Sequence, residues 1–167
     1  MSTVDETVQA NQAYARDFDS GNLKMPPSRK LAVLACMDAR LIPDQILGFK
    51  IGEAHVIRNA GGIATEDALR SFIISHHLLG TREFVIINHT DCGMLTFKDE
   101  EFLFSLEQKT GISTIAPVHF HSFTDLEYNL RQQIKRVKGH PWIPKDIPVR
   151  GFIYDVRTGK LKEVASE

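Results

Sequence analysis

The sequence predicts an α/β protein with a mainly parallel central sheet, flanking helices, and an antiparallel edge strand or hairpin at the C-terminus. Three observations support this fold class: short apolar runs that end in small-residue loops, a helical stretch between two of these runs, and a turn signal near the end of the chain. The length of 167 residues suits one compact domain. We expect that domain over residues 25–167, preceded by an N-terminal arm over residues 1–24.

The arm is predicted to be a short amphipathic helix with little core. Val4 and Val8 recur at helical spacing, and the pattern stops at residues 20–22. Residues 25–28 contain two prolines, which favour an extended connector because proline lacks a backbone donor and restricts the residue before it. The connector therefore separates the arm from the body.

Three apolar runs predict strands that are covered on both faces, as in a parallel sheet. They span residues 30–37, 54–59 and 83–89. A helical pattern over residues 63–79 lies between the second and third runs. This order gives a strand, helix, strand unit with a right-handed crossover.

Two further helices are predicted at residues 95–109 and 123–138, the second with a capping start at Ser122. The segment between them is left unassigned. Residues 149–164 alternate like two strands around a Thr-Gly turn at 158–159, which predicts a β-hairpin.

The composition excludes several classes of protein. Hydrophobic residues make up 43% of the chain and charged residues 25%, and 20 basic against 21 acidic side chains give a net charge of -1. This balance offers no electrostatic case for binding nucleic acid or an anionic membrane. The first residues do not resemble a secretory signal, and no stretch is apolar for long enough to span a bilayer. We expect a cytoplasmic protein.

Two cysteines and a histidine stand at the ends of two predicted strands. Cys36 ends the first strand, and His89 and Cys92 follow the third. Because parallel strands deliver their carboxyl ends to one edge of a sheet, these side chains can meet there. Two thiolates and one imidazole suit a catalytic zinc ion that keeps its fourth position for water. Two alternatives stay open: the cysteines are small core residues, or another histidine or a carboxylate completes a closed structural zinc site.

Asp38 and Arg40 follow Cys36 at a spacing that fits a supporting role. The carboxylate can accept a hydrogen bond from zinc-bound water, and the guanidinium can hold that carboxylate ionised and oriented. The alternative is an ordinary surface ion pair. Beside a cysteine ligand, we favour the supporting role.

Two short motifs resemble the signatures of a known enzyme family. They are Cys36-Met37-Asp38-Ala39-Arg40 and His89-Thr90-Asp91-Cys92-Gly93. They are similar to the Cys-x-Asp-x-Arg and His-x-x-Cys-Gly signatures of the β-class carbonic anhydrases, in its compact prokaryotic-type branch. Arg58-Asn59-Ala60-Gly61-Gly62, between the motifs, adds to this resemblance, which covers roughly residues 30–156.

The resemblance implies a lyase that hydrates carbon dioxide reversibly to bicarbonate and a proton, by attack of zinc-bound hydroxide. It implies one Zn2+ per subunit, with Cys36, His89 and Cys92 as metal ligands. Asp38 and Arg40 would then be the catalytic dyad.

The resemblance also implies a substrate-binding role and an assembly. Backbone amides at Gly61 and Gly93 would help to hold the substrate oxygens. Family members are usually dimers or tetramers, so a homodimer or homotetramer is expected, with the arm over residues 1–24 packing on a neighbouring subunit.

Two other functions are kept as alternatives. A related zinc hydrolase acting on COS or CS2 could use the same chemistry, because these linear molecules present a similar electrophilic carbon. From a different class, the chain could be a non-catalytic zinc-binding module or a redox sensor that uses Cys36 and Cys92. The Asp38 and Arg40 pair argues against this second alternative, since neither role needs an oriented carboxylate.

The remaining histidines are given structural interpretations. His76 and His77 are adjacent in a predicted helix and point in different directions, which favours a solvated helix end over a proton relay. His119 and His121 can share a face of an extended segment, but no carboxylate ligand lies nearby in the sequence. His55 is interpreted as a hydrogen-bonded edge residue rather than a proton shuttle.

Overall fold

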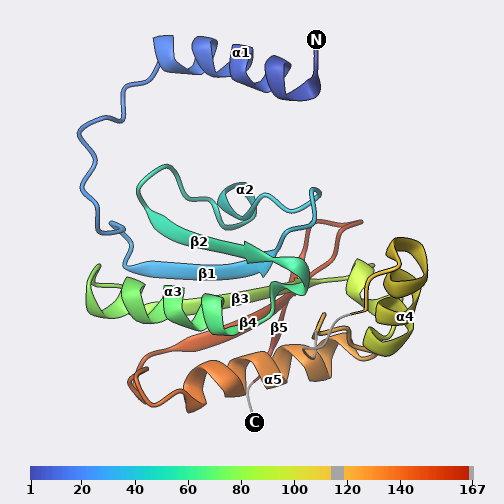
Figure 1. Cartoon of the computed structure of the whole chain (residues 1–167). Helices are drawn as coiled ribbons and strands as arrows, with labels where there is room; N and C mark the ends of the chain where they lie inside the picture. Colours follow the sequence, from blue (N-terminus) through green and yellow to red (C-terminus); the bar gives the residue numbers. More distant parts are fainter. Residues whose placement is uncertain (114–118, 166–167) are drawn as a thin grey trace.

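The computed structural model describes residues 1–113 and 119–165. Its centre is a five-stranded sheet with the strand order β2-β1-β3-β4-β5 (Figure 1). The strands are β1 (Leu31–Cys36), β2 (Ala54–Asn59), β3 (Glu83–His89), β4 (Val149–Tyr154) and β5 (Leu161–Val164). The helices are α1 (Thr3–Arg16), α2 (Pro43–Leu47), α3 (Glu66–His77), α4 (Asp99–Thr110) and α5 (Leu126–Gly139), with short 3-10 helices η1 (Ala60–Gly62) and η2 (Gly93–Leu95).

The sheet is parallel except at its C-terminal edge. β2, β1, β3 and β4 pair in the parallel direction, whereas β5 pairs with β4 in the antiparallel direction. Leu34 of β1 lies beside Ile57 of β2 and Ile86 of β3. β1 and β3 therefore end at the same edge of the sheet. The predicted fold class is confirmed, including the C-terminal hairpin.

Both faces of the sheet are covered, which explains the continuous apolar runs. Ala32 and Leu34 of β1 pack in one core cluster with residues of α3 and α5. Val33 and Ala35 pack on the opposite face with residues around α2 and the loop after β3. All four side chains are fully buried. Because burying one large apolar side chain stabilises a fold by about 1.5–3 kcal/mol, this packing holds the end of β1 rigidly.

Three predicted helices begin later than the sequence pattern indicates, including α5, which was predicted from residue 123 and begins at Leu126. The pattern over residues 63–79 corresponds to α3, which begins at Glu66 after Thr65 caps it. The helix predicted over residues 95–109 corresponds to α4, but its predicted start is wrong, because residues 93–95 form η2 and α4 begins at Asp99. The short helix α2 was not predicted at all. Among the described residues, no helix combines the length and apolar character that a membrane span requires.

The predicted capping residue of α5 is also wrong. Asp125 caps α5, since its side chain accepts a hydrogen bond from the Tyr128 N–H at 2.8 Å. The Ser122 N–H instead donates to Asp99 Oδ1 at 2.9 Å, which holds Ser122 in a loop beside α4. The unassigned segment before it lies partly outside the described residues, and its described residues 111–113 and 119–122 form no regular element.

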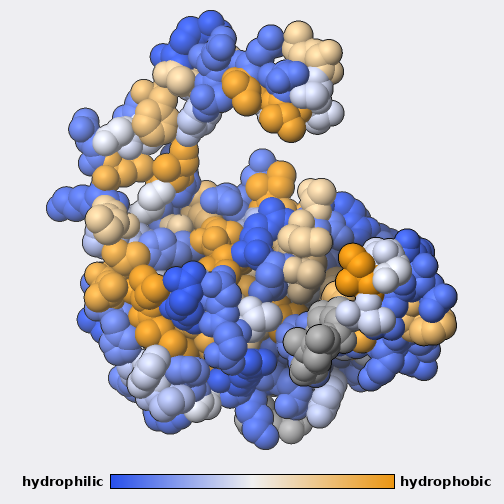
Figure 2. Space-filling model, in the orientation of Figure 1, coloured by the Kyte–Doolittle hydropathy of each residue, from blue (hydrophilic) through white to orange (hydrophobic). Residues whose placement is uncertain are grey.

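Helix α1 lies apart from the body of the molecule (Figure 1). Its start is capped reciprocally: Ser2 Oγ accepts from the Asp5 N–H at 3.2 Å, and the Asp5 carboxylate accepts from the Ser2 N–H at 2.8 Å. No residue of α1 is buried, and Val4 and Val8 are 69% and 60% exposed. Figure 2 shows apolar surface on the side of α1 that faces the body across an open gap. The packing of this arm on a neighbouring subunit stays a prediction.

Candidate active site

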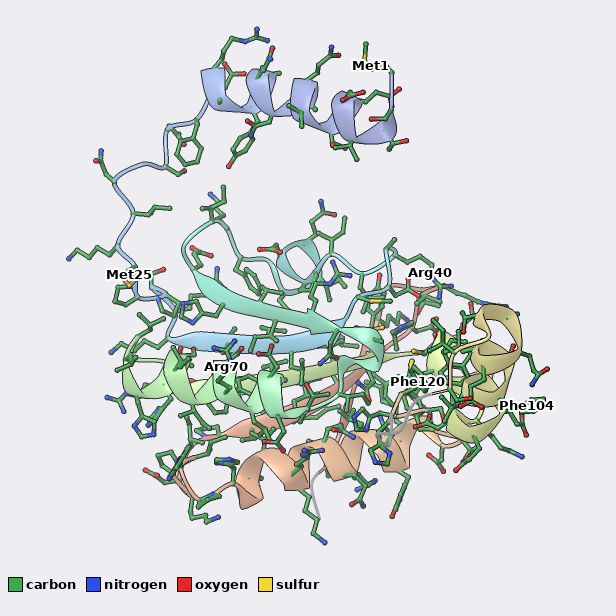
Figure 3. All side chains as sticks on the ribbon, in the orientation of Figure 1. Met1, Met25, Arg40, Arg70, Phe104 and Phe120 are labelled. Atoms are coloured by element: carbon green, nitrogen blue, oxygen red, sulfur yellow. The ribbon has the colours of Figure 1, made fainter. Side chains whose placement is uncertain are left out.

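Three side chains meet where β1 and β3 end. Cys36 is the last residue of β1, His89 is the last residue of β3, and Cys92 directly precedes η2. Their ligand atoms all lie within 4.8 Å of one another, and all three residues are buried. Figure 3 shows Arg40 at this same edge of the sheet. The convergence predicted from the strand pattern is confirmed.

His89 is oriented as a metal ligand. Its Nδ1 lies 2.8 Å from the carbonyl oxygen of Thr90, and because a carbonyl can only accept, Nδ1 carries the proton. His89 Nε2 then has a free lone pair. Within the described part of the chain, it is the one buried side-chain nitrogen or oxygen without a hydrogen-bond partner. Such a group is costly unless something satisfies it, so the site fits a bound metal ion.

The two thiols complete a set of donors that suits zinc. Neither cysteine is in a disulfide, and both are buried. Contact with the Cys92 thiol lowers the pKa of Cys36, and the same contact, together with burial, raises the pKa of Cys92. The pair therefore favours a thiolate at Cys36, the form in which a cysteine binds a metal ion. Two sulfur atoms and one imidazole nitrogen match the preferences of Zn2+ rather than those of Mg2+ or Ca2+.

Arg40 and Asp38 form a bidentate ion pair beside these donors. Arg40 Nε donates to Asp38 Oδ1 at 2.9 Å, and Nη2 donates to Oδ2 at 2.7 Å. These hydrogen bonds hold the pKa of the Asp38 carboxyl well below its usual range. Asp38 Oδ2 lies 3.8 Å from His89 Nε2. An ionised, oriented carboxylate therefore borders the three donors.

Arg40 also contacts the second loop that carries donors. Its Nη1 donates to Asp91 Oδ2 at 2.7 Å, and its Nη2 donates to the Asp91 carbonyl oxygen at 2.9 Å. One guanidinium therefore joins the loop after Cys36 to the loop between His89 and Cys92. The sequence motif contained Asp91, but its spacing gave no reason to pair it with Arg40.

Arg58 fixes the backbone of the first loop. Its Nε donates to the Cys36 carbonyl oxygen at 3.0 Å, and its Nη2 donates to the Asp38 carbonyl oxygen at 2.7 Å. Arg58 lies near the end of β2, and the pairing of Cys36 with Asn59 brings it alongside β1. In the sequence, Arg58 stood out only as part of the family resemblance, and its hydrogen bonds to the backbone of the first loop were not predicted. An arginine at the end of a neighbouring strand is the one signal that could have suggested it.

The two glycines predicted to bind substrate both lie beside the donors. The Gly61 N–H donates to Cys36 Sγ at 3.3 Å. Gly61 has a φ of +82°, and a Cβ there would lie 3.0 Å from Met94 Cγ, so the position requires glycine. Gly93 begins η2 directly after Cys92. Contact of either glycine with substrate stays a prediction.

The other histidines have surroundings that fit structural roles. His55 Nδ1 lies 2.7 Å from Ser75 Oγ, so His55 is a hydrogen-bonded residue of the edge strand β2. His77 is exposed at the end of α3, as predicted, whereas His76 is half-buried and its Nδ1 lies 2.8 Å from the Thr81 carbonyl oxygen. His119 and His121 are also exposed, and no group of potential metal ligands found in the described residues includes them.

Comparison with known proteins decides between the families that such a site allows. A family model described as carbonic anhydrase matches residues 31–161. Beta-carbonic anhydrase 1 of Mycobacterium tuberculosis (strain H37Rv) is 48% identical over 165 residues, which cover 98% of this chain and 99% of that protein. The chain belongs to the β-carbonic anhydrase family. β-Carbonic anhydrases use zinc, and the cluster of Cys36, His89 and Cys92 is the metal site that this chain offers.

Other members of the family carry two different names. The crystal structure of carbonic anhydrase from Streptococcus mutans matches with a TM-score of 0.93 and 42% identity, covering 99% of both chains. A carbon disulfide hydrolase of Acidithiobacillus thiooxidans is 37% identical over 157 residues, which cover 83% of this chain and 78% of that protein. Relatives named for a second substrate therefore share the family with the carbonic anhydrases.

Proposed function

We propose that this β-carbonic anhydrase family member hydrates carbon dioxide reversibly to bicarbonate and a proton. The observation that carries the proposal is the convergence of three zinc donors beside an ionised carboxylate. We assign Cys36, His89 and Cys92 as the ligands of one Zn2+ per chain, and Asp38 and Arg40 as the catalytic dyad.

The chain's own residues position the reactants. When bound, zinc supplies Lewis-acid activation of water at neutral pH. Asp38 lies where its carboxylate can accept a hydrogen bond from the attacking water and direct the water's lone pair toward the carbon of CO2. Because Arg40 keeps this carboxylate ionised, Asp38 stays an acceptor. The contacts between Arg40 and Asp91 prevent the guanidinium from swinging away. We further assign the amides at Gly61 and Gly93 to the substrate oxygens.

Stopped-flow hydration of CO2, followed with a pH indicator, tests the proposal. Protein stripped with a chelator should be inactive and should regain activity in proportion to added zinc, up to about one equivalent per chain. Zinc-replete protein that gives no hydration above the uncatalysed rate would refute the proposal. Zinc binding without turnover would favour the non-catalytic zinc-binding role.

A second candidate function is hydrolysis of CS2 or COS. It is supported by the carbon disulfide hydrolase named above and by a solved apo form of carbon disulfide hydrolase, which matches with a TM-score of 0.73 and 31% identity. Measuring sulfide release from CS2 and COS beside CO2 hydration separates the two functions. Sulfide release without CO2 hydration would assign the second.

We also propose a homodimer or homotetramer in which the arm packs on a neighbouring subunit. Two facts support this proposal. Helix α1 buries no residue, and its apolar side chains Val4, Val8 and Tyr14 are largely exposed. Contiguous exposed apolar surface commonly marks an interface. Sedimentation velocity measures the assembly. We expect the protein to act in the cytoplasm, where reducing conditions keep two cysteine ligands as thiols.

A further inference from the structure

Three buried side-chain amides form a line through the core, from α5 to the candidate metal centre. Gln133 and Asn129 belong to α5, and Asn88 belongs to β3, next to His89. The exposed fractions of Gln133, Asn129 and Asn88 are 8%, 8% and 1%. Polar side chains in such a place are unfavourable unless they are hydrogen-bonded. Their partners therefore show what the amides hold in place.

The amides are joined by hydrogen bonds that all run in one direction. The Ala64 N–H donates to Gln133 Oε1, Gln133 Nε2 donates to Asn129 Oδ1, Asn129 Nδ2 donates to Asn88 Oδ1, and Asn88 Nδ2 donates to the Gly61 carbonyl oxygen, each at 2.9 Å. The line begins on a backbone N–H and ends on a backbone carbonyl, so the orientation of every amide between them is fixed. Aligned hydrogen bonds of this kind polarise and strengthen one another.

The last residue of the line touches the sulfur of a metal donor. The Gly61 carbonyl accepts from Asn88, and the Gly61 N–H donates to Cys36 Sγ at 3.3 Å. Gly61 and Gly62 have φ values of +82° and +62°, and glycine allows many other conformations. A Cβ on Gly62 would lie 3.0 Å from both Asn88 Nδ2 and the Cys36 backbone nitrogen. The amide of Asn88 therefore braces a loop that has little stiffness of its own.

We propose that Asn88, Asn129 and Gln133 are positioning residues that hold the Gly61 N–H against the sulfur of Cys36. This inference rests on the proposed function as a zinc enzyme and deepens it. A hydrogen bond to a ligating sulfur fixes the direction of its lone pairs and withdraws charge from it, which adjusts how strongly it binds a metal. The line of amides thereby makes the metal centre depend on a helix that contributes no donor to it.

The variant Asn129→Leu tests this proposal at a residue of α5 that is not itself a candidate metal ligand. It removes both central hydrogen bonds with little change in side-chain volume. The matched control is Leu130→Ala, because Leu130 is the next residue of α5, is fully buried and lies outside the line of amides. Two quantities are measured: zinc affinity by competition with a chromogenic chelator, and the sulfur-to-metal charge-transfer band of the Co2+-substituted protein.

Asn129→Leu should weaken zinc binding by about 10-fold or more and shift the cobalt band. Leu130→Ala should leave both quantities unchanged while lowering the stability of the fold. Gln133→Met, which breaks the line at its far end, should give a smaller effect in the same direction. The proposal is overturned if Asn129→Leu and Gln133→Met bind zinc and cobalt as the unaltered protein does.

A measurement on the unaltered protein covers the case in which Asn129→Leu fails to fold. In the 113Cd-substituted protein, the Gly61 amide proton should show scalar coupling to the metal through its hydrogen bond to Cys36 Sγ. Absence of that coupling in a protein that binds cadmium would also overturn the proposal. Failure of the unaltered protein to bind any of these metals would instead refute the proposed function.

Discussion

The donor edge of the sheet and helix α1 are held in opposite ways. At the donor edge, Cys36, His89 and Cys92 are 4%, 0% and 3% exposed, and Arg40 and Arg58 tie the flanking loops to one another and to the sheet. Helix α1 has no buried residue, and its start is stabilised by its own capping hydrogen bonds.

The difference shows which of the two regions is held in place by contacts within its own chain. The donors sit on strand ends whose position is fixed by core packing on both faces of the sheet. Helix α1 has 14 residues, a length at which an isolated helix is only marginally stable in water. The three candidate metal ligands thus come from one chain, whereas α1 buries no residue against the body of that chain.

The largest effect is expected from Cys36→Ala. This change removes one of three donors, so zinc content should fall from about one equivalent to near zero, and CO2 hydration should fall to the uncatalysed rate. Metal analysis and stopped-flow assays measure both. Arg70→Ala, at an exposed ion pair with Asp67, is the control and should change neither. Retained zinc in Cys36→Ala would remove this cysteine from the site.

Asp38→Asn should show whether Asp38 orients the attacking water without contributing to metal binding. The amide keeps the shape of the side chain but loses the charge that Arg40 holds, so activity should fall by about 100-fold while zinc content is kept. Asp67→Asn breaks the remote pair with Arg70 and serves as the matched control. Normal CO2 hydration by Asp38→Asn would contradict the role of the dyad.

The double change Val4→Asp and Val8→Asp tests whether α1 packs on a neighbouring subunit. Charges on the apolar side of α1 should weaken self-association by about 10-fold or more, as measured by sedimentation velocity, with zinc content unchanged. Gln9→Asp places a charge on the same helix and should have little effect. An unchanged assembly in the double variant would mean that the arm packs on no neighbour.

A smaller effect is expected at Asp99, which tethers the loop before α5 to the start of α4. Partial burial acts to raise the pKa of Asp99, but hydrogen bonds from Ser122, His121 and Phe120 outweigh it and lower the pKa overall. A carboxyl group whose pKa is lower in the folded than in the unfolded state stabilises the fold above its unfolded value of about 3.9. That stabilisation is lost as the pH falls through the folded pKa.

The variant Asp99→Asn should therefore cost about 1 kcal/mol at pH 7 and progressively less toward pH 3. Urea unfolding at the two pH values measures the difference, and Glu100→Gln, on the exposed side of α4, provides the control. An equal cost at both pH values would show that the Asp99 charge does not hold this loop.

The sequence was sufficient to predict those features of the fold and the site that depend on the periodicity of apolar residues and on the order of the strands. The apolar run ending at Cys36 and the run ending at His89 predicted parallel neighbours, and parallel strands deliver their ends to one edge. The three donors and the position of Asp38 followed from that rule. The resemblance to the family added the reaction.

Three of the misses share a physical cause, because each depends on contacts between residues distant in sequence. Ser122 looked like a helix cap, but Asp99 accepts its N–H. Asn88 and Asn129 bond across 41 positions of sequence, and neither belongs to a motif that would suggest it. The pairing of Arg58 with the Cys36 carbonyl requires the register of two strands, which the pattern of apolar residues does not specify.

X-ray absorption at the zinc edge of the zinc-loaded protein tests the central claim most directly. Coordination by Cys36, His89 and Cys92 with one position left for solvent predicts two sulfur atoms at about 2.3 Å and two nitrogen or oxygen atoms at about 2.0–2.1 Å. A zinc shell with one sulfur atom, or with none, would contradict the account.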